Sequence, residues 1–518
     1  MSSWLELQKN LVEAHELIAE IDVETITLTR IGGYKATPYS LKQNLPSEPT
    51  AKSLKGVWRW WARTAIVGAC NGKIDYKKAN EYLNKILGGT GKSEGVSLFR
   101  LEISDVRFPE NFETKLSQIN NEIDNFYNKA KDFLMNQVSQ LHLPQNTEVS
   151  VTLNPSTPAI IIQNKTIPLD QYRNDTDNSI KRGPLKDYFV KSELRLKRNK
   201  RYHRIFVTLQ ISKLNRYSQI PRVRLLLMKR RLEEEDNLKR NNIDSEQIIK
   251  YLERIKEEMA VLVSEGIKFR ISLYGSKDVE KVNFVLSSLM LSLILGGIGS
   301  MTKRAFGSLK LLSFRFGPVL KIDQEIQEIF QELQNKQFTK DELKKMLENL
   351  CNITVNYAKR LFNIREVQES RDIPNVPSLS NIKIEVIECS SLDLVKIGEA
   401  FVKQTWKLSP MAQGRDLHTW ILGLPRFQQG TGYAIKINRD YESPRRLSSI
   451  GVRCFKAHNK NFIIVFGLLS NDWPKNLWHI RHKGPELKKQ VKDISIGSSL
   501  QKVFDQAFRE VSNRVCQK

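Results

Sequence analysis

Residues 267–316 read IKFRISLYGSKDVEKVNFVLSSLMLSLILGGIGSMTKRAFGSLKLLSFRF, and this stretch decides the fold. Its first ten residues alternate between apolar and polar side chains, which predicts a strand over 267–276. An apolar run predicts a buried helix over 279–295, and a glycine-rich turn leads from it into a second alternating segment at 307–316. This order of strand, helix, turn and strand is typical of one half of a ferredoxin-like α+β sandwich.

The segments before this stretch supply the other half of that sandwich. Residues 1–20 predict a short amphipathic helix. VETITLTRIGGY (23–34) and GVSLFRLEISDVRF (95–108) alternate and predict strands, and SLKGVWRWWART lies between them in a helix expected over 52–69. Large insertions separate the two halves: a polar helical segment at 109–141, strand-like pieces around a basic stretch at 145–225, and a charge-rich helix at 228–262.

A second α+β unit is expected from residue 381 onward. Its predicted elements are a strand, IKIEVIEC, a helix at 391–406, three strands, GYAIKIN, SIGVRCFKA and NFIIVFGLL, and a helical tail at 486–515. We therefore predict an α+β protein with two ferredoxin-like, RRM-like domains that carry large helical and basic insertions. The predicted parts are an N-terminal domain over 1–316 with insertions at 109–262, a helical connector over 317–380, and a C-terminal domain over 381–518.

The chain is strongly basic. Its 518 residues include 82 Lys and Arg against 57 Asp and Glu, which gives a net charge of +25 and a pI near 9.7. Such an excess favours polyanionic partners, because each neutralised phosphate releases condensed counterions. The sequence does not open with a basic segment followed by an apolar one, and the apolar run at 282–299 is too short and too rich in serine for a comfortable membrane span. We expect a cytoplasmic protein with no membrane contact.

The residue types that support catalysis or metal binding do not form recognisable motifs. The five cysteines lie far apart, with no CxxC pair, which argues against a zinc ribbon and a disulfide framework and fits a reducing compartment. The seven histidines form no HExxH or HxH pair, and no nucleophile elbow is present. GGTGKSEG (88–95) ends like a phosphate-binding loop, but isoleucine stands at position 86, where that loop requires glycine. We predict no catalytic residue, metal or cofactor.

The tryptophan-rich helix divides into a core side and a basic side. At about 100° per residue, four cations fall within an arc of roughly 80°, and we call Lys52, Lys55, Arg59 and Arg63 the basic stripe. The opposite side carries the residues expected in the core: Leu54, Trp58, Trp61 and Ala65. Trp60 borders the stripe. Surface helices usually mix charges, whereas this stripe has no acidic partner at i±4, which favours a phosphate track. An ordinary solvated charged face is also compatible with this pattern.

The glycine-rich loop, residues 296–307, is the second candidate site. Glycine frees the backbone for positive φ and close approach, and exposed N–H groups bind phosphate oxygens. A Lys-Arg pair adds charge at the same place, although the glycines alone are also compatible with a tight helix-to-strand turn. The residues expected to bind an anion here are Gly296, Gly297, Gly299, Lys303, Arg304 and Gly307.

Two further basic segments suit nucleic acid. From Lys181 to Arg231, seventeen Lys and Arg stand against two acids, with Tyr and Phe interleaved, a pattern in which bases stack and phosphates pair. A flexible solvated insertion would have the same composition. In the second unit, SPRRLSSIG (443–451) contributes Arg445 and Arg446.

These motifs together resemble a known family. IGG after the first strand, KSLKGVWRWWAR and LGGIGSMTKRAFGSLKL are similar to the signature of the RAMP superfamily of CRISPR proteins, which builds on ferredoxin-like domains with a glycine-rich loop before the last strand. The tryptophan helix resembles that of the first-numbered RAMP subunits of Cmr (type III-B) effector complexes. The resemblance covers residues 22–106 and 267–316, and extends in weaker form to 381–470.

The resemblance implies a non-catalytic subunit that holds the 3′ region of the CRISPR RNA and the paired target RNA beside other Cmr subunits. The glycine-rich loop and the basic stripe would then contact the RNA backbone. KRAFGSLKL lacks the usual stacking aromatics, so backbone binding is favoured over base readout. Two other functions fit the sequence: a metal-independent endoribonuclease that processes CRISPR RNA with histidine as general acid and base, and a structural docking subunit with a basic surface for acidic partners.

Overall fold

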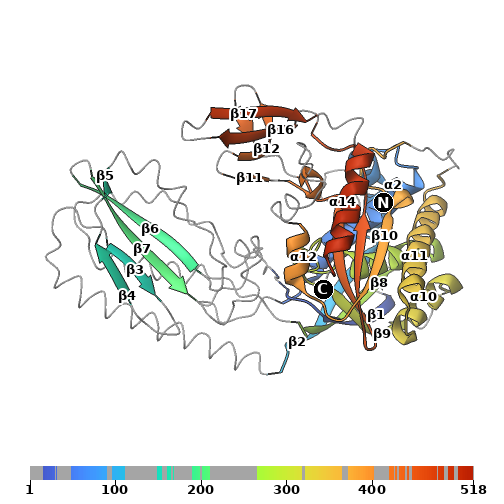
Figure 1. Cartoon of the computed structure of the whole chain (residues 1–518). Coiled ribbons are helices and arrows are strands. Elements are labelled where there is room, and N and C mark those ends of the chain that lie inside the picture. The colour runs from blue at the N-terminus through green and yellow to red at the C-terminus, as the bar shows by residue number, and fades with distance from the viewer. Residues whose placement is uncertain are drawn as a thin grey trace, which may run out of the picture. The chain divides into compact units, whose positions relative to one another are not determined.

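The computed structural model divides the chain into two compact units, residues 1–32, 48–109 and 263–518 in the first, and 33–47 and 110–262 in the second (Figure 1). The residues that the structure describes are 16–29, 31, 48–89, 96–110, 149–153, 160–164, 167–168, 189–198, 201–210, 265–317, 321–364, 372–401, 419–424, 426–428, 431–437, 440–442, 446–474, 477–483, 488–494 and 500–516.

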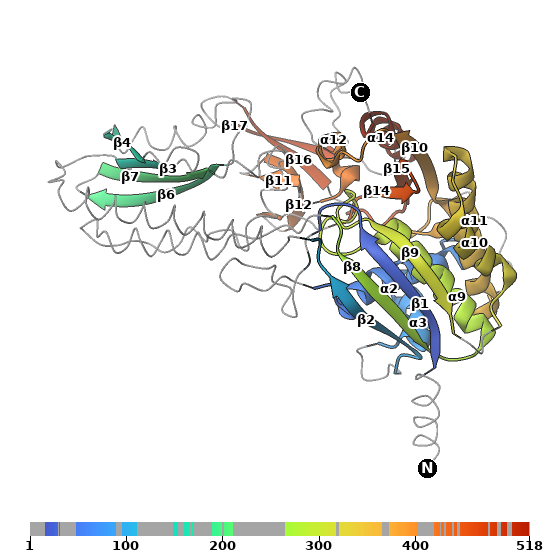
Figure 2. The same ribbon diagram turned by 90° about the horizontal axis from the view of Figure 1, so that it is seen from below.

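The first unit contains a four-stranded antiparallel sheet. Its strands are β1 (Leu17–Thr25), β2 (Phe99–Arg107), β8 (Lys268–Gly275) and β9 (Leu309–Phe316), in the order β2-β8-β1-β9 (Figure 2). Alternating side chains of β1 are buried, Ile21 and Val23 among them, because only one face of the sheet is covered. Strand β1 begins six residues earlier than the sequence pattern suggested, at LIAEIDVET, whose own alternation defines it.

Helices cover the apolar face of this sheet. They are α2 (Ala51–Ala69), α3 (Tyr76–Leu87) and α9 (Val279–Leu291), and α9 continues into a π-helical turn, η3 (Ser292–Gly296). The segment Val279–Gly296 is long and apolar enough to cross a membrane, but 83% of it is buried inside the protein, so it is accounted for as a core helix. The predicted helices over 52–69 and 279–295 are confirmed.

The opposite face of the sheet carries charged side chains that pair across strands. Arg270 lies 2.9 Å from Asp22 and 3.2 Å from Asp105, and Arg315 lies 2.9 Å from Glu20. Among the elements described, none covers this face in Figure 2. Such paired charges keep an open sheet face compatible with water without leaving it strongly cationic.

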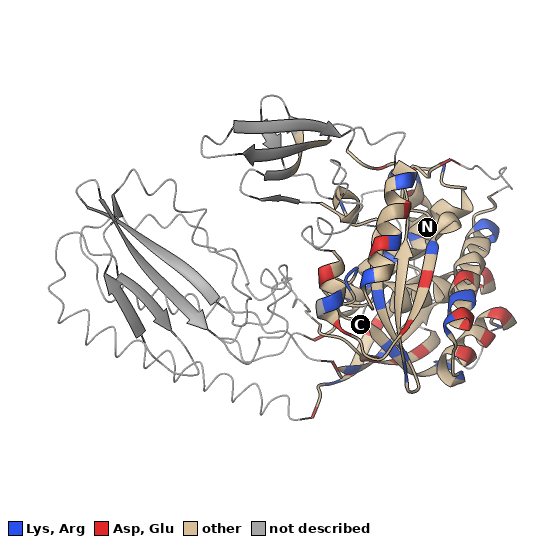
Figure 3. Cartoon of the chain, in the orientation of Figure 1, with Lys and Arg blue, Asp and Glu red and all other residues tan. Residues whose placement is uncertain are grey.

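The first unit has two halves, one built around the four-stranded sheet and the other around strands that begin at residue 383. Two helices connect these halves, as the sequence predicted for residues 322–363. They are α10 (Gln324–Asn335), whose charged residues are all acidic, and α11 (Lys340–Leu361), which carries both acidic and basic residues (Figure 3). Phe330 of α10 stacks on Phe314 of β9 with ring centroids 3.7 Å apart. Helix α11 begins at a capping box formed by Thr339 and Glu342.

The second sheet of this unit is buried on both faces. It has the order β10-β15-β14, with β10 at Lys383–Cys389, β14 at Ile450–Ala457 and β15 at Lys460–Gly467. Phe466 packs against Trp61 of α2 at 5.5 Å between ring centroids, whereas the adjacent Gly467 faces Phe504 and Phe508 of α14 (Leu500–Arg514). Because both faces are covered, β14 and β15 are nearly continuous apolar runs.

Three short elements lie around this sheet, α12 (Leu394–Ala400) and the turns η4 (Leu379–Asn381) and η6 (Thr419–Leu422), and a disulfide lies beside them. The disulfide joins Cys389, at the end of β10, to Cys516, after α14. The expectation of a chain without disulfides is therefore corrected. The fold brings together two cysteines that are 127 residues apart in sequence, and no local spacing reveals such a pair.

A further sheet replaces part of the predicted helical tail. Its strands are β11 (Arg426–Gln428), β12 (Thr431–Ile437), β13 (Asp440–Glu442), β16 (Leu477–Lys483) and β17 (Lys488–Ile494). The prediction of a helix over 486–515 is wrong in its first part, because residues 488–494 pair with β16, and it is correct from residue 500 onward.

The second unit is described only in its strands. They are β3 (Val149–Leu153), β4 (Ile160–Asn164), β5 (Ile167–Pro168), β6 (Phe189–Arg198) and β7 (Arg201–Gln210), with the order β4-β3-β7-β5 and β6 on β7. The β6–β7 hairpin lies within the basic stretch 181–231. The helices predicted over 1–20, 109–141 and 228–262 fall wholly or largely outside the described residues.

Candidate nucleic-acid interface

Helix α2 begins at a capping box and lies between the four-stranded sheet and the β10-β15-β14 sheet of the first unit. Thr50 and Ser53 exchange side-chain and backbone hydrogen bonds at its start. Trp58 is fully buried and its indole N–H donates to Ser288 Oγ of α9 at 2.9 Å. Trp61 is buried on another side of the helix against Phe466. The prediction that these two tryptophans anchor the helix is confirmed.

Trp60 occupies the border between the core and the surface, as predicted. It is half-buried and meets the edge of Trp61 with ring centroids 5.0 Å apart. The Lys303 ammonium group lies 4.8 Å from the Trp60 ring centroid and donates to the Ser448 carbonyl at 2.6 Å. Burial, with a smaller contribution from Arg446, lowers the pKa of Lys303 to about 7. The glycine-rich loop and α2 therefore meet at this Lys–Trp contact.

The basic stripe is not an unpartnered row of charges. The Arg59 guanidinium donates to the Leu87 carbonyl at 3.0 Å, to the Gly88 carbonyl and to the Asn84 side chain, and so it caps the end of α3. Arg63 bonds Asn80 and lies over the Tyr76 ring at 4.9 Å. The sequence showed only that acids are missing at i±4, whereas carbonyls and amides of α3 serve as the partners.

The two lysines of the stripe differ from the arginines. Lys55 is half-buried and donates to Ser97 Oγ at 3.1 Å, and burial lowers its pKa. Lys52 is exposed, in the first turn of α2. Of the four stripe residues, Lys52 thus presents its charge most openly to solvent.

The inner part of the glycine-rich loop is shaped by packing. A Cβ at Gly296 would overlap Val57 and Trp61, a Cβ at Gly297 would overlap Arg453 and the Gly307 carbonyl, and one at Gly307 would overlap the Ile298 carbonyl. Gly297 and Gly307 also have positive φ values of 76° and 60°. These three glycines are therefore required by contacts within the protein.

Arg453, from β14, fills the space that these glycines leave. It is fully buried, and its guanidinium donates to the carbonyls of Thr302, Phe306 and Gly307, each at 2.8 Å. No carboxylate pairs with it within the described residues, and burial lowers its pKa to about 10. Sequence reasoning missed this residue, although an arginine inside the apolar run IGVRCF was a usable signal.

The outer turn of the loop, residues 299–303, remains accessible. Ser300 is exposed, and Gly299 and Met301 have positive φ values of 85° and 59°. Within the part of the chain that the structure describes, the backbone N–H groups of residues 299–303 donate to no acceptor. Successive amides in such a conformation form a concavity that suits an anion.

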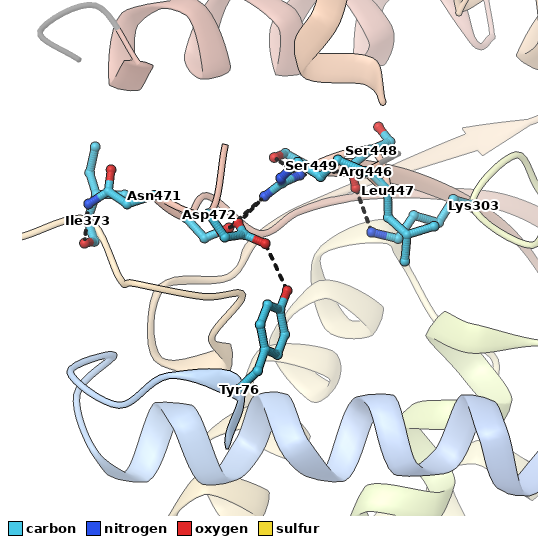
Figure 4. A network of polar contacts seen from close by, with 10 residues as sticks. Tyr76, Lys303, Ile373, Arg446, Leu447, Ser448, Ser449, Asn471 and Asp472 are labelled. Carbon is cyan, nitrogen blue, oxygen red and sulfur yellow. Dashed lines mark hydrogen bonds and ion pairs between the residues drawn. The ribbon is translucent and has the colours of Figure 1, made fainter. Parts of the chain in front are cut away.

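Arg446, another predicted cation, is held in a polar network at the junction of the halves (Figure 4). Arg446 pairs with Asp472, donates to Ser470 at 2.8 Å and lies over the Trp473 ring at 3.7 Å. Asp472 also accepts a 2.8 Å hydrogen bond from the Tyr76 hydroxyl. Arg446 is therefore neutralised within the protein, and Arg445 lies outside the described residues.

Arg304 is also turned inward. It is 8% exposed, and its guanidinium lies 4.7 Å from the Phe401 ring centroid. The structure thus brings together Lys303, Trp60 and the glycine-rich loop, and it engages Arg59, Arg63, Arg304 and Arg446 with partners of their own.

Comparison with known proteins places the chain in a family. The sequence model of the RAMP superfamily matches residues 23–310, which is more than half of the chain. The chain belongs to the RAMP superfamily. The match contains the tryptophan helix, the glycine-rich loop and the insertion between them.

Individual RAMP relatives are distant in sequence. The CRISPR system CMR subunit Cmr1 of Saccharolobus solfataricus is 24% identical over 296 residues, which are 54% of this chain and 52% of that protein, so the match spans about half of the relative's length. A chain of the type III-B Cmr-beta complex bound to cognate target RNA and AMPPnP has a TM-score of 0.50 at 15% identity, with 96% of this chain and 100% of that chain covered. This likeness shows a shared fold. Cmr1 from Pyrococcus furiosus gives a TM-score of 0.41 at 13% identity, covering 94% of this chain and 96% of that chain.

Proposed function

We propose that the chain is a non-catalytic RNA-binding subunit of a Cmr (type III-B) CRISPR effector complex in the cytoplasm. It holds the 3′ region of the CRISPR RNA and the paired target RNA, and other Cmr subunits are its protein partners. Membership of the RAMP superfamily and the names of the relatives support this role, since one is a CMR subunit and another belongs to a complex bound to target RNA.

The observation that carries the proposal is the junction of α2 with the outer turn. The sequence contains no Asp or Glu from residue 49 to residue 74, and five Lys or Arg stand in this segment. The outer turn meets this helix where Lys303 lies over Trp60, and it presents five N–H groups without acceptors in the described residues. Cations beside open amides bind phosphate regardless of base sequence.

The open face of the first sheet is a poor alternative for RNA. Its arginines are paired with carboxylates, and Tyr274 is covered by Arg100 at 4.8 Å from the ring centroid. Stacking of bases on a sheet requires accessible aromatic rings, which this face does not offer among the described residues. RNA is therefore expected at the loop edge of the sheet and not on its face.

We also infer that both halves of the first unit are ferredoxin-like RAMP domains, with boundaries at 1–316, 317–380 and 381–518. The strand order β9-β1-β8-β2, with α2 after the first strand and α9 after the third, supports this for the first half. The order β10-β15-β14, with α12 after the first strand and α14 after the third, supports it for the second.

The test is binding of the full chain to a fluorescent single-stranded RNA at several salt concentrations. Lys52→Ala combined with Lys55→Ala should weaken binding about tenfold for every sequence tested, and should reduce the salt slope by about 1.4 if each lysine neutralises one phosphate. The matched control is Lys340→Ala with Lys345→Ala, which removes two exposed cations from α11. Equal affinities of the two double variants would contradict an RNA track on α2.

A second measurement separates binding from catalysis. Incubation of the chain with CRISPR repeat RNA in EDTA should leave the RNA intact. If the RNA is cleaved at a specific site and a single His→Ala change abolishes this cleavage, the chain is an endoribonuclease and the proposal is wrong.

A further inference from the structure

Gly56 stands on the surface of α2, where glycine is unfavourable. Glycine inside a helix is less stable than alanine because the unfolded chain has more freedom to lose. Gly56 is the sixth residue of a helix of 19 residues, so it lies in the interior of the helix and not at a cap. A glycine at such a position is expected only where something must come close to the backbone.

Among the residues that the structure describes, no atom comes close to Gly56. Gly56 is exposed, and a Cβ added there would meet no atom within 4 Å. Gly68 of the same helix has the opposite surroundings, because a Cβ added there would lie 3.0 Å from both Ser380 N and Val355 Cγ2. Internal packing thus explains Gly68 and leaves Gly56 without a reason inside the described chain.

The neighbours of Gly56 indicate what approaches it. On the helix surface its i−4, i+3 and i+7 neighbours are Lys52, Arg59 and Arg63, and its i+4 neighbour is the half-buried Trp60. The nearest acids in the sequence are Glu48 and Asp75, outside α2 on either side. Arg59 and Arg63 are engaged by α3, so Lys52 is the exposed cation beside Gly56. A bare stretch of helix that lies next to a lysine and carries no acid fits a polyanion better than a protein segment, whose own backbone carries no net charge.

We propose that Gly56 is the point of closest approach of RNA on this protein, where a ribose-phosphate segment lies directly against the backbone of α2. This inference rests on the proposed function and adds to it a residue that carries no charge. Because Gly56 has no side chain, the sugar-phosphate backbone can lie close to the axis of α2. Lys52 and the outer turn of the glycine-rich loop can then reach its phosphates at the same time.

The experiment compares stability with RNA affinity in the full chain. Gly56→Ala and Gly56→Leu should leave Tm unchanged or raise it by about 1–3 °C, because both residues favour a helix. The same variants should weaken binding of a fluorescein-labelled single-stranded RNA of mixed sequence, by about threefold for alanine and about tenfold or more for leucine. Loss of affinity without loss of stability, graded with side-chain size, is the expected result.

Asn352→Leu is the matched control, because it adds a similar side chain to an exposed position of α11. It should leave the affinity for RNA unchanged. If Gly56→Leu binds RNA like the wild type while Lys52→Ala with Lys55→Ala binds weakly, this inference falls and the proposed function stands. If the wild type itself does not bind RNA, both fall. If Gly56→Leu retains RNA but no longer co-purifies with Cmr subunits, the surface faces a protein and the inference is overturned.

Discussion

The glycines of the glycine-rich loop and Gly56 on the surface of α2 have different surroundings. Gly297 and Gly307 are enclosed by Arg453 and by neighbouring carbonyls, so any side chain there would overlap the protein itself. Gly56 is enclosed by nothing described in the chain. The comparison teaches that a glycine within a basic motif identifies a ligand site only after its surroundings are known, because the glycines of the loop serve internal packing.

The largest effect is expected for Gly297→Ala. Its methyl group would overlap Arg453 and the Gly307 carbonyl, and its φ of 76° is unfavourable for alanine. We expect a loss of at least about 4 kcal/mol in the free energy of unfolding, or failure to fold. Urea unfolding measures this free energy, and Gly56→Ala is the matched control. Equal stability of the two alanine variants would remove the distinction between the two regions.

Arg453→Met should have a somewhat smaller effect. It removes the guanidinium donor from three carbonyls, of which those of Thr302 and Gly307 keep a backbone N–H donor, at a cost of about 3 kcal/mol. The removal of an unpaired buried charge offsets part of this loss. Arg453→Lys should lose nearly as much, since an ammonium group cannot reach three carbonyls as the planar guanidinium does. Lys456→Met on the same strand is the control. A stable Arg453→Met variant would mean that the loop holds its shape without β14.

The smallest effect concerns Lys303, at the boundary between the enclosed and the accessible parts of the loop. Its pKa is about 7 in the folded protein and near 10.5 when unperturbed, so folding releases a proton between these pH values and stability from this group rises across that window. Lys303→Met removes the effect. Between pH 7 and pH 10 the Tm of the wild type should therefore rise relative to that of the variant. Parallel Tm curves would show that the ammonium group is not enclosed.

Much of the first half could be predicted from periodicity. The strands β8 and β9, the helices α2 and α9, and the core roles of Trp58 and Trp61 follow from apolar spacing, which depends on neighbours in the chain. Alternation was also present in LIAEIDVET and LWHIRHK, and a closer count would have found β1 and β16 at their true positions.

The roles of individual cations could not be predicted, because they depend on contacts between distant segments. Arg59 caps α3, Arg446 pairs with Asp472, and Arg453 enters a loop about 150 residues earlier in the chain. Each looks like an available charge in the sequence. The Cys389–Cys516 bond is hidden for the same reason, and the accessible site is reduced to Lys52, Lys55, Trp60, Lys303 and the outer turn.

The insertion of Arg453 into the glycine-rich loop also determines how this protein can be dissected. Severing the chain between its two halves would leave the loop without its guanidinium and expose the apolar face of β14 and β15 that covers α2. Neither fragment should then fold alone. Two polypeptides divided at this point should instead behave as complementary fragments, which are insoluble alone and reassemble when they are produced in the same cell.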